Sequence, residues 1–166
     1  MQPNILVIAL AALVPLVMGF IWYHPKVFGT AWMKAAGVTE ESKKGANMAL
    51  IFGLTYVFSF LVAFALNLMV VHQWHMYSIL MNTVGFGVPG SHVDSMLTDF
   101  MNQYGHEFRS YRHGALHGFI GGMTVALPII SVNALFERKG FKYIALNAGF
   151  WIVCFMIMGA IICEYV

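Results

Sequence analysis

Four long stretches of this sequence contain no Asp, Glu, Lys or Arg, and each is long enough to cross a lipid bilayer. A helix needs about 20 apolar residues to span the roughly 30 Å of hydrocarbon. Within that region the backbone must satisfy its own hydrogen bonds, so the stretches are predicted to be helices. They are Ile5–Tyr23, Asn47–Val71, Gly114–Phe136 and Tyr143–Cys163.

The composition supports the same class of protein. Hydrophobic residues make up 60% of the 166 residues and charged residues 10%, whereas a soluble domain has about 25% charged residues. So few charges cannot cover a surface that faces water. The sequence therefore predicts one all-α integral membrane domain over residues 1–166, a bundle of four transmembrane helices surrounded by lipid.

The basic residues indicate an orientation. The connections 24–46 and 137–142 must lie on the same side of the membrane, because two spans separate them. Their basic residues are Lys26, Lys34, Lys43, Lys44, Arg138, Lys139 and Lys142. The opposite side has only Arg109 and Arg112. Positive residues near spans stay in the cytoplasm, so both termini and the long connection 72–113 are expected outside it.

The long outer connection is predicted to contain one amphipathic helix, at about 92–104. Ser91 suits its N-cap and Gly105 its end. Its apolar residues recur at helical spacing: Val93, Met96, Leu97, Phe100, Met101 and Tyr104. Such a helix either lies on the outer membrane surface or covers the end of the bundle.

Three glycines in the third span predict a close helix contact. Gly114, Gly118 and Gly122 form two overlapping GxxxG steps, which let another backbone approach one face of the helix. The spacing does not say whether the partner helix belongs to the same chain or to a second copy. Self-association through this face is one of the two readings.

The spans also contain polar residues at two depths. Asn67 and His117 lie about one turn inside the outer edge, and Asn133 and Asn147 about one turn inside the inner edge. Since the third and fourth spans are antiparallel and joined by a short turn, we expect Asn133 and Asn147 to meet, directly or through a shared partner. Such contacts serve mainly as structural glue, worth roughly 1 kcal/mol each.

The histidines are concentrated on the outer side. Those in or near it are His72, His75, His92, His106, His113 and His117. His113 and His117 are four residues apart on one helix face, the spacing at which two imidazoles chelate a metal ion. His106 falls on the same stripe, and His72 and His75 end the second span. A transition metal or haem is therefore one hypothesis, with hydrogen-bonded structural histidines or proton handling at His117 as alternatives.

Other classes of function have less support. The sequence has no GxSxG elbow, phosphate-binding loop or dinucleotide fingerprint, so an enzyme is the less favoured reading and no catalytic residue is assigned. A net charge of +2, without a basic patch interleaved with aromatic residues, argues against nucleic acid as a partner. The partner that the sequence does predict is the lipid bilayer.

Four strings resemble a bacterial membrane family known as domain of unknown function 1761. They are WYHPKVFGTAWM at 22–33, HGALHG at 113–118, NALFER at 133–138 and NAGF at 147–150. The resemblance covers nearly the whole chain. It implies a small four-helix protein of the bacterial inner (cytoplasmic) membrane, and it implies no activity.

Three functional hypotheses follow. The first is a small oligomeric scaffold or interaction protein that uses the glycine face and the aromatic inner loop. The second is a transporter or channel, which requires Asn67, His117 and Asn147 to line one continuous polar cavity. The third is a metal- or haem-binding protein, which requires the ring nitrogens of His113, His117 and a third ligand to converge on one point.

Overall fold

The computed structural model describes residues 3–39, 41 and 44–166. Residues 40, 42 and 43, which include Lys43 of the basic connection, lie outside the described part. The α-helices are α1 (Ile5–Ala11), α2 (Val14–Trp22), α3 (Thr30–Ala36), α4 (Met48–Val70), α5 (Gln73–Leu80), α6 (His92–Tyr104), α7 (Tyr111–Gly121), α8 (Leu127–Phe136) and α9 (Phe141–Tyr165). Two π-helical turns, η1 (Pro25–Gly29) and η3 (Gly122–Ala126), join helices. The described residues contain no strand, so the predicted all-α class is confirmed.

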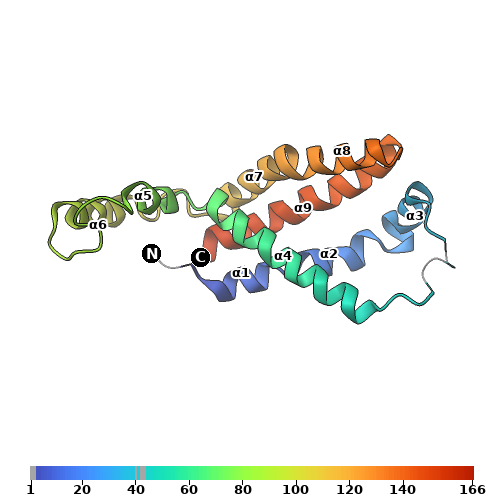
Figure 1. Cartoon of the computed structure of the whole chain (residues 1–166), viewed down its shortest axis with the longest axis horizontal. Helices are drawn as coiled ribbons and strands as arrows, with labels where there is room; N and C mark the ends of the chain where they lie inside the picture. Colours follow the sequence, from blue (N-terminus) through green and yellow to red (C-terminus); the bar gives the residue numbers. More distant parts are fainter. Residues whose placement is uncertain (1–2, 40, 42–43) are drawn as a thin grey trace.

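Four helical segments are long and apolar enough to cross a membrane, with mean hydropathies of 1.8 to 2.7. They are Ile5–Trp22, Met48–Val70, Tyr111–Phe136 and Phe141–Tyr165. In the last of these, α9, 50% of the most apolar window is buried, against 17 to 22% in the others. The fold is thus a four-helix membrane bundle with α9 at its centre (Figure 1).

Proline interrupts two of the spans, as its missing N–H requires. The first span turns between α1 and α2, where Pro15 is the second residue of α2. The third span contains the π-helical turn η3 directly before α8, in which Pro128 is again the second residue. Both breaks lie inside otherwise continuous apolar segments.

The helices α5 and α6 form an arm that projects from one end of the bundle (Figure 1). The amphipathic helix is confirmed as α6, and the Ser91 hydroxyl accepts a hydrogen bond from the Asp94 N–H at 3.1 Å. The helix does not cover the bundle end, because it lies out along the arm (Figure 1). Its expected position on the outer membrane surface stays a prediction. Its apolar residue Leu97 is buried within the arm, because α6 packs on α5.

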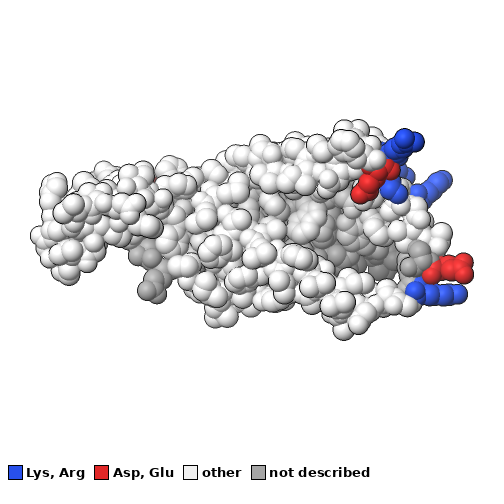
Figure 2. Space-filling view, in the orientation of Figure 1, with Lys and Arg blue, Asp and Glu red and all other residues white. Residues whose placement is uncertain are grey.

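Most of the basic residues lie at the opposite end of the molecule. Lys and Arg side chains gather there around α3 and the α8–α9 turn (Figure 2). The Lys139 ammonium donates to the Ala36 carbonyl at 2.7 Å and so ties α3 to that turn. Both termini lie at the other end, near the base of the arm (Figure 1). We refer to these as the lysine-rich end and the arm end.

The glycine face of the third span packs within the chain, against α9. A Cβ atom at Gly114 would overlap the carbonyl oxygen of Gly159, and one at Gly118 would overlap that of Phe155. A Cβ at Gly122 would lie 2.8 Å from the Cα of Ile152. The two helix backbones are in direct contact along three turns, so this face is occupied by the same chain.

The expected contact between Asn133 and Asn147 does not form. Asn133 is an exposed residue of α8. The Asn147 carbonyl oxygen instead accepts from the Tyr23 hydroxyl at 3.4 Å and the Trp32 N–H at 3.1 Å, and its NH₂ group donates to the Tyr143 carbonyl. The two amides share a depth but face different directions around their helices, which depth alone does not reveal.

Candidate metal centre

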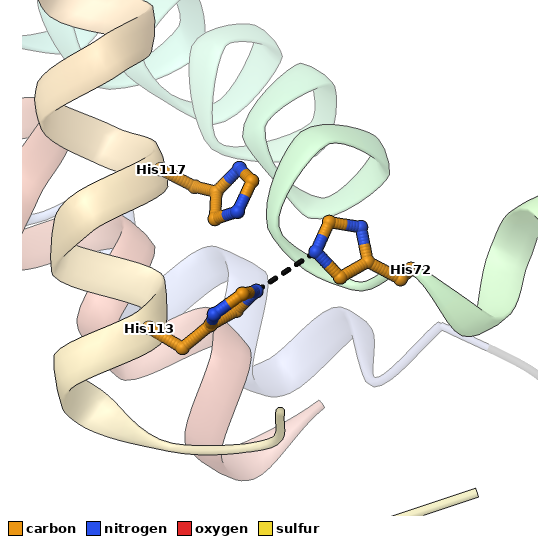
Figure 3. A group of neighbouring side chains, drawn as sticks. All are labelled: His72, His113 and His117. Carbon is orange, nitrogen blue, oxygen red and sulfur yellow. Dashed lines mark hydrogen bonds between the residues drawn. The ribbon is translucent and has the colours of Figure 1, made fainter. Parts of the chain in front are cut away.

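Three histidines, two from α7 and one from the connection between α4 and α5, meet at the arm end of the bundle. His72 lies between the end of α4 and the start of α5. His113 and His117 lie one turn apart near the start of α7, where Ser110 caps the helix by accepting from the His113 N–H at 3.3 Å. Their rings project from α7 toward His72 (Figure 3). The second and third spans are therefore joined through these side chains.

The ligand atoms of the three rings are close enough to share one ion. One nitrogen from each ring can be chosen so that all three lie within 4.8 Å of one another. The Nε2 atoms of His72 and His113 are hydrogen-bonded at 2.8 Å. The ring centroids are 4.4 Å apart for His113 and His117, 4.8 Å for His72 and His117, and 4.9 Å for His72 and His113.

The other two candidate histidines lie apart from this group. The His75 ring is 6.5 Å from that of His72, measured between centroids, and its Nδ1 bonds to the His72 carbonyl at 3.2 Å. His106 lines a separate pocket together with Arg109 and Glu164. Within the described ranges, the metal-competent group comprises His72, His113 and His117.

The surroundings of the three histidines are held by a set of hydrogen bonds. The Trp74 N–H donates to the buried Asn67 carbonyl oxygen at 3.1 Å, and the Gln73 amide donates to the Glu107 carbonyl at 3.0 Å. Arg109 Nε donates to the Cys163 carbonyl at 2.7 Å. These bonds fix the chain directly after His72 and directly before α7, and so they position both walls of the site.

The electrostatics favour a neutral imidazole at His72. Partial burial, together with the neighbouring His117 and His75, lowers the pKa of His72 below its ordinary value of 6.5. Neutral imidazole is the form that binds metal. No carboxylate belongs to the group among the residues described, so a bound ion keeps its full positive charge.

Only a small rearrangement separates this geometry from metal coordination. Zn–N bonds of about 2.0–2.1 Å at a tetrahedral ion place two ligand nitrogens about 3.3 Å apart. The His72–His113 nitrogen pair at 2.8 Å is close to that spacing, and the three rings are only partly buried. All three nitrogens already lie within 4.8 Å of one another, so the spacing is near that of ligands to one ion.

The sequence named all three of these histidines, but within a set of five. The spacing of His113 and His117 identified two ligands, since it depends only on the helix that contains both. Choosing His72 over His75 and His106 required the direction in which the chain leaves α4. The aromatic contacts of Asn147 with Tyr23 and Trp32 were not predicted, because no local pattern links residues so far apart.

Comparison with known proteins gives a family but no function. A protein family described as "Protein of unknown function (DUF1761)" matches residues 6–163. The chain belongs to this family. The resemblance seen in the four sequence strings is thereby confirmed. No curated protein and no solved structure matches the chain.

Proposed function

We propose that this DUF1761 protein is a membrane protein that binds a single transition-metal ion through His72, His113 and His117. The observation that supports the proposal is the convergence of their ring nitrogens within 4.8 Å. This is the arrangement that the metal hypothesis required, with His72 as the third ligand. An ionisable side chain inside a membrane costs free energy and often has a function. Here two such residues, His113 and His117, share a site with His72.

The ligand set favours Zn²⁺ or Cu²⁺. Imidazole nitrogens suit Zn, Cu, Fe and Ni, and Cu²⁺ binds most tightly in the usual order of divalent ions. Three histidines leave a fourth position for water or another small ligand. Haem is less favoured, because two axial imidazoles bind on opposite faces of the porphyrin. Ring centroids only 4.4 to 4.9 Å apart leave no room for a macrocycle between them.

The two rival hypotheses have less support. A transport path requires a cavity shared by Asn67, His117 and Asn147, but the described pockets do not join them. Asn67 and Asn147 each have hydrogen-bond partners of their own. Of the two features behind the oligomeric scaffold, the glycine face packs against α9 of the same chain, which leaves the aromatic inner loop.

The arm end is proposed to face outward from the bacterial inner membrane. The lysine-rich end carries most basic residues (Figure 2), and such residues stay in the cytoplasm. With this orientation, the site lies near the extracytoplasmic surface of the inner membrane and takes its ion from that side.

Elemental analysis tests the proposal. Protein purified in detergent without chelator, then equilibrated with Zn²⁺ or Cu²⁺ and desalted, is expected to hold about one ion per chain, because a three-histidine site binds through three coordinate bonds. An ion at a hundredfold excess over its dissociation constant stabilises the fold by about 2.7 kcal/mol. A matching rise in the thermal midpoint is therefore expected.

Matched histidine variants provide the control. His113→Ala and His117→Ala are expected to lose the ion and the thermal shift. His75→Ala and His106→Ala remove nearby histidines outside the group and are expected to keep both. Equal metal retention in the two sets of variants, or no retention by the wild-type protein, would contradict the proposal.

A further inference from the structure

A second candidate site lies at the lysine-rich end, about the motif at 22–33, which has no part in the metal centre. A groove of about 640 Å³ runs between α2 and α4. Tyr23, His24, Pro25 and Trp32 from that motif line it. Phe150, from the string at 147–150, lines it too. Two segments that are far apart in sequence therefore form one wall.

This wall is held rigidly. The Tyr23 ring lies 5.1 Å from both the Trp32 and the Phe150 rings, measured between centroids. The Tyr23 hydroxyl and the Trp32 N–H both donate to the Asn147 carbonyl oxygen. The groove is thus shaped by interlocked aromatic rings.

The polar atoms of the lining are mostly engaged within the chain. Besides Tyr23 and Trp32, the Thr55 hydroxyl donates to the Ile51 carbonyl at 2.8 Å, and His24 Nδ1 accepts from the Lys26 N–H at 3.2 Å. What remains for an occupant is a surface of ring faces and aliphatic groups. Such a surface suits a saturated chain better than a headgroup that needs several hydrogen bonds.

The groove opens along the side of the bundle. Phe20 is 66% exposed and Ile51 is 45% exposed, and both line it. Neighbouring Gly19 also lines the groove, and a Cβ there would meet no atom within 4 Å. In a membrane-spanning segment this side faces lipid, so an acyl chain has direct access.

Basic residues lie close in sequence to residues that line the groove. Lys26 directly follows the lining residue Pro25, and Lys44 lies just before the lining residue Met48. Arg138, Lys139 and Lys142 are at the same end, against the acids Glu41 and Glu137 in the part of the chain that is described there. The described residues at this end of the bundle therefore have a net positive charge, which is complementary to a phosphate headgroup.

We propose that this groove binds an acyl chain of an anionic phospholipid, with the phosphate against Lys26, Lys44 and the outer edge of His24. The apolar lining takes the chain and the basic residues take the headgroup. The site is formed by residues other than the three histidines, so it stands independently of the metal centre.

Native mass spectrometry tests this. The protein is reconstituted in nanodiscs with equal amounts of phosphatidylglycerol and phosphatidylcholine of identical chains, released, and its retained lipids are counted. The wild-type protein is expected to retain phosphatidylglycerol preferentially. Gly19→Leu fills the groove and is expected to lower retention about tenfold. Gly53→Leu is the matched control, since a Cβ at Gly53 also meets nothing within 4 Å and Gly53 does not line the groove.

The headgroup is tested separately. A lysine near an anionic surface changes affinity by about fivefold, so Lys26→Gln with Lys44→Gln is expected to abolish the preference for phosphatidylglycerol while some chain binding remains. Equal retention by Gly19→Leu and Gly53→Leu would overturn the proposal. So would equal retention of the two lipids by the wild-type protein, or displacement of both lipids by a neutral isoprenoid quinone added in equal amount.

Discussion

At the scale of single residues, His72 determines the candidate centre, because it alone comes from outside α7. Its imidazole must be neutral to donate a lone pair, and its lowered pKa extends the pH range in which it is. Protonation of His72 therefore affects both the binding of the proposed ion and the stability of the fold. Partial burial, His117 and His75 all oppose a positive charge on His72.

The metal-free protein is predicted to lose stability as the pH falls below about 6.5, the ordinary pKa of histidine. His72 has a lower pKa folded than unfolded, so in that window the unfolded chain binds more protons and stability rises with pH. Thermal melts between about pH 5 and pH 8 measure this. The variant His72→Asn should flatten the profile, and a profile as steep as that of wild type would refute the assignment.

The two asparagines near the lysine-rich end are predicted to behave differently. Asn147→Ala removes the acceptor for Tyr23 and Trp32 and should cost about 1–2 kcal/mol, at roughly 1 kcal/mol per interhelical bond. Asn133 is exposed, and Asn133→Ala should change stability by less than about 0.5 kcal/mol. Unfolding in detergent with increasing denaturant compares them, and equal losses would contradict the observed partners.

At the scale of elements, the contact between α7 and α9 holds the bundle together. Lipid is as apolar as the helix surfaces, so helices gain little from apolar burial and depend on close packing. The small residues Gly114, Gly118 and Gly159 allow that packing. The contact also sets the position of His113 and His117, since both lie on the helix that Gly114 and Gly118 hold against α9.

A methyl group at this contact is predicted to destabilise the fold. Gly118→Ala places a Cβ against the Phe155 backbone, which cannot give way as a flexible side chain does, and should cost about 1–3 kcal/mol. Gly53→Ala, at an open position of α4, is the control and should be neutral or slightly stabilising, because alanine is the better helix former. Thermal unfolding that ranks the two variants the other way round would exclude this packing role.

The spans and the arm helix are predictable from sequence for a physical reason. A charge-free run such as Tyr143–Cys163 must be helical in lipid, whatever it packs against, and the capping by Ser91 is local. The partners of Asn147 and the choice of His72 depend on how helices rotate against one another. The depth of a residue in the membrane and its spacing along the sequence do not determine that rotation. The sequence therefore predicts a contact between Asn133 and Asn147 that does not form, and it leaves five histidines as candidate ligands.

At the scale of the whole molecule, the two ends differ in charge and in proposed ligand. The lysine-rich end has the aromatic groove, and the arm end has the three histidines and both termini (Figure 1). An ion and an anionic lipid would therefore bind on opposite sides of the membrane. The orientation in which the chain is inserted then decides which ligand binds on which side.

That orientation is predicted to place the C-terminus outside the cytoplasm, since positive residues are retained inside. A C-terminal alkaline phosphatase fusion should be active, because the enzyme matures only after export, and a C-terminal green fluorescent protein fusion should be dark. A fusion within the α8–α9 turn should give the reverse pattern. A fluorescent C-terminal fusion would show that the bundle is inverted and that the histidines face the cytoplasm.

The position of His72 and His113 has a mechanical consequence. The chain leaves the bundle for the arm at His72 and returns just before His113, and their ring nitrogens are 2.8 Å apart. An ion bound to both would join the two ends of the arm, in addition to the bond from Gln73 to the Glu107 carbonyl. Any load on the arm would then be transmitted to the coordinate bonds. Conversely, release of the ion would loosen the hinge by which the arm is attached to the membrane-embedded helices.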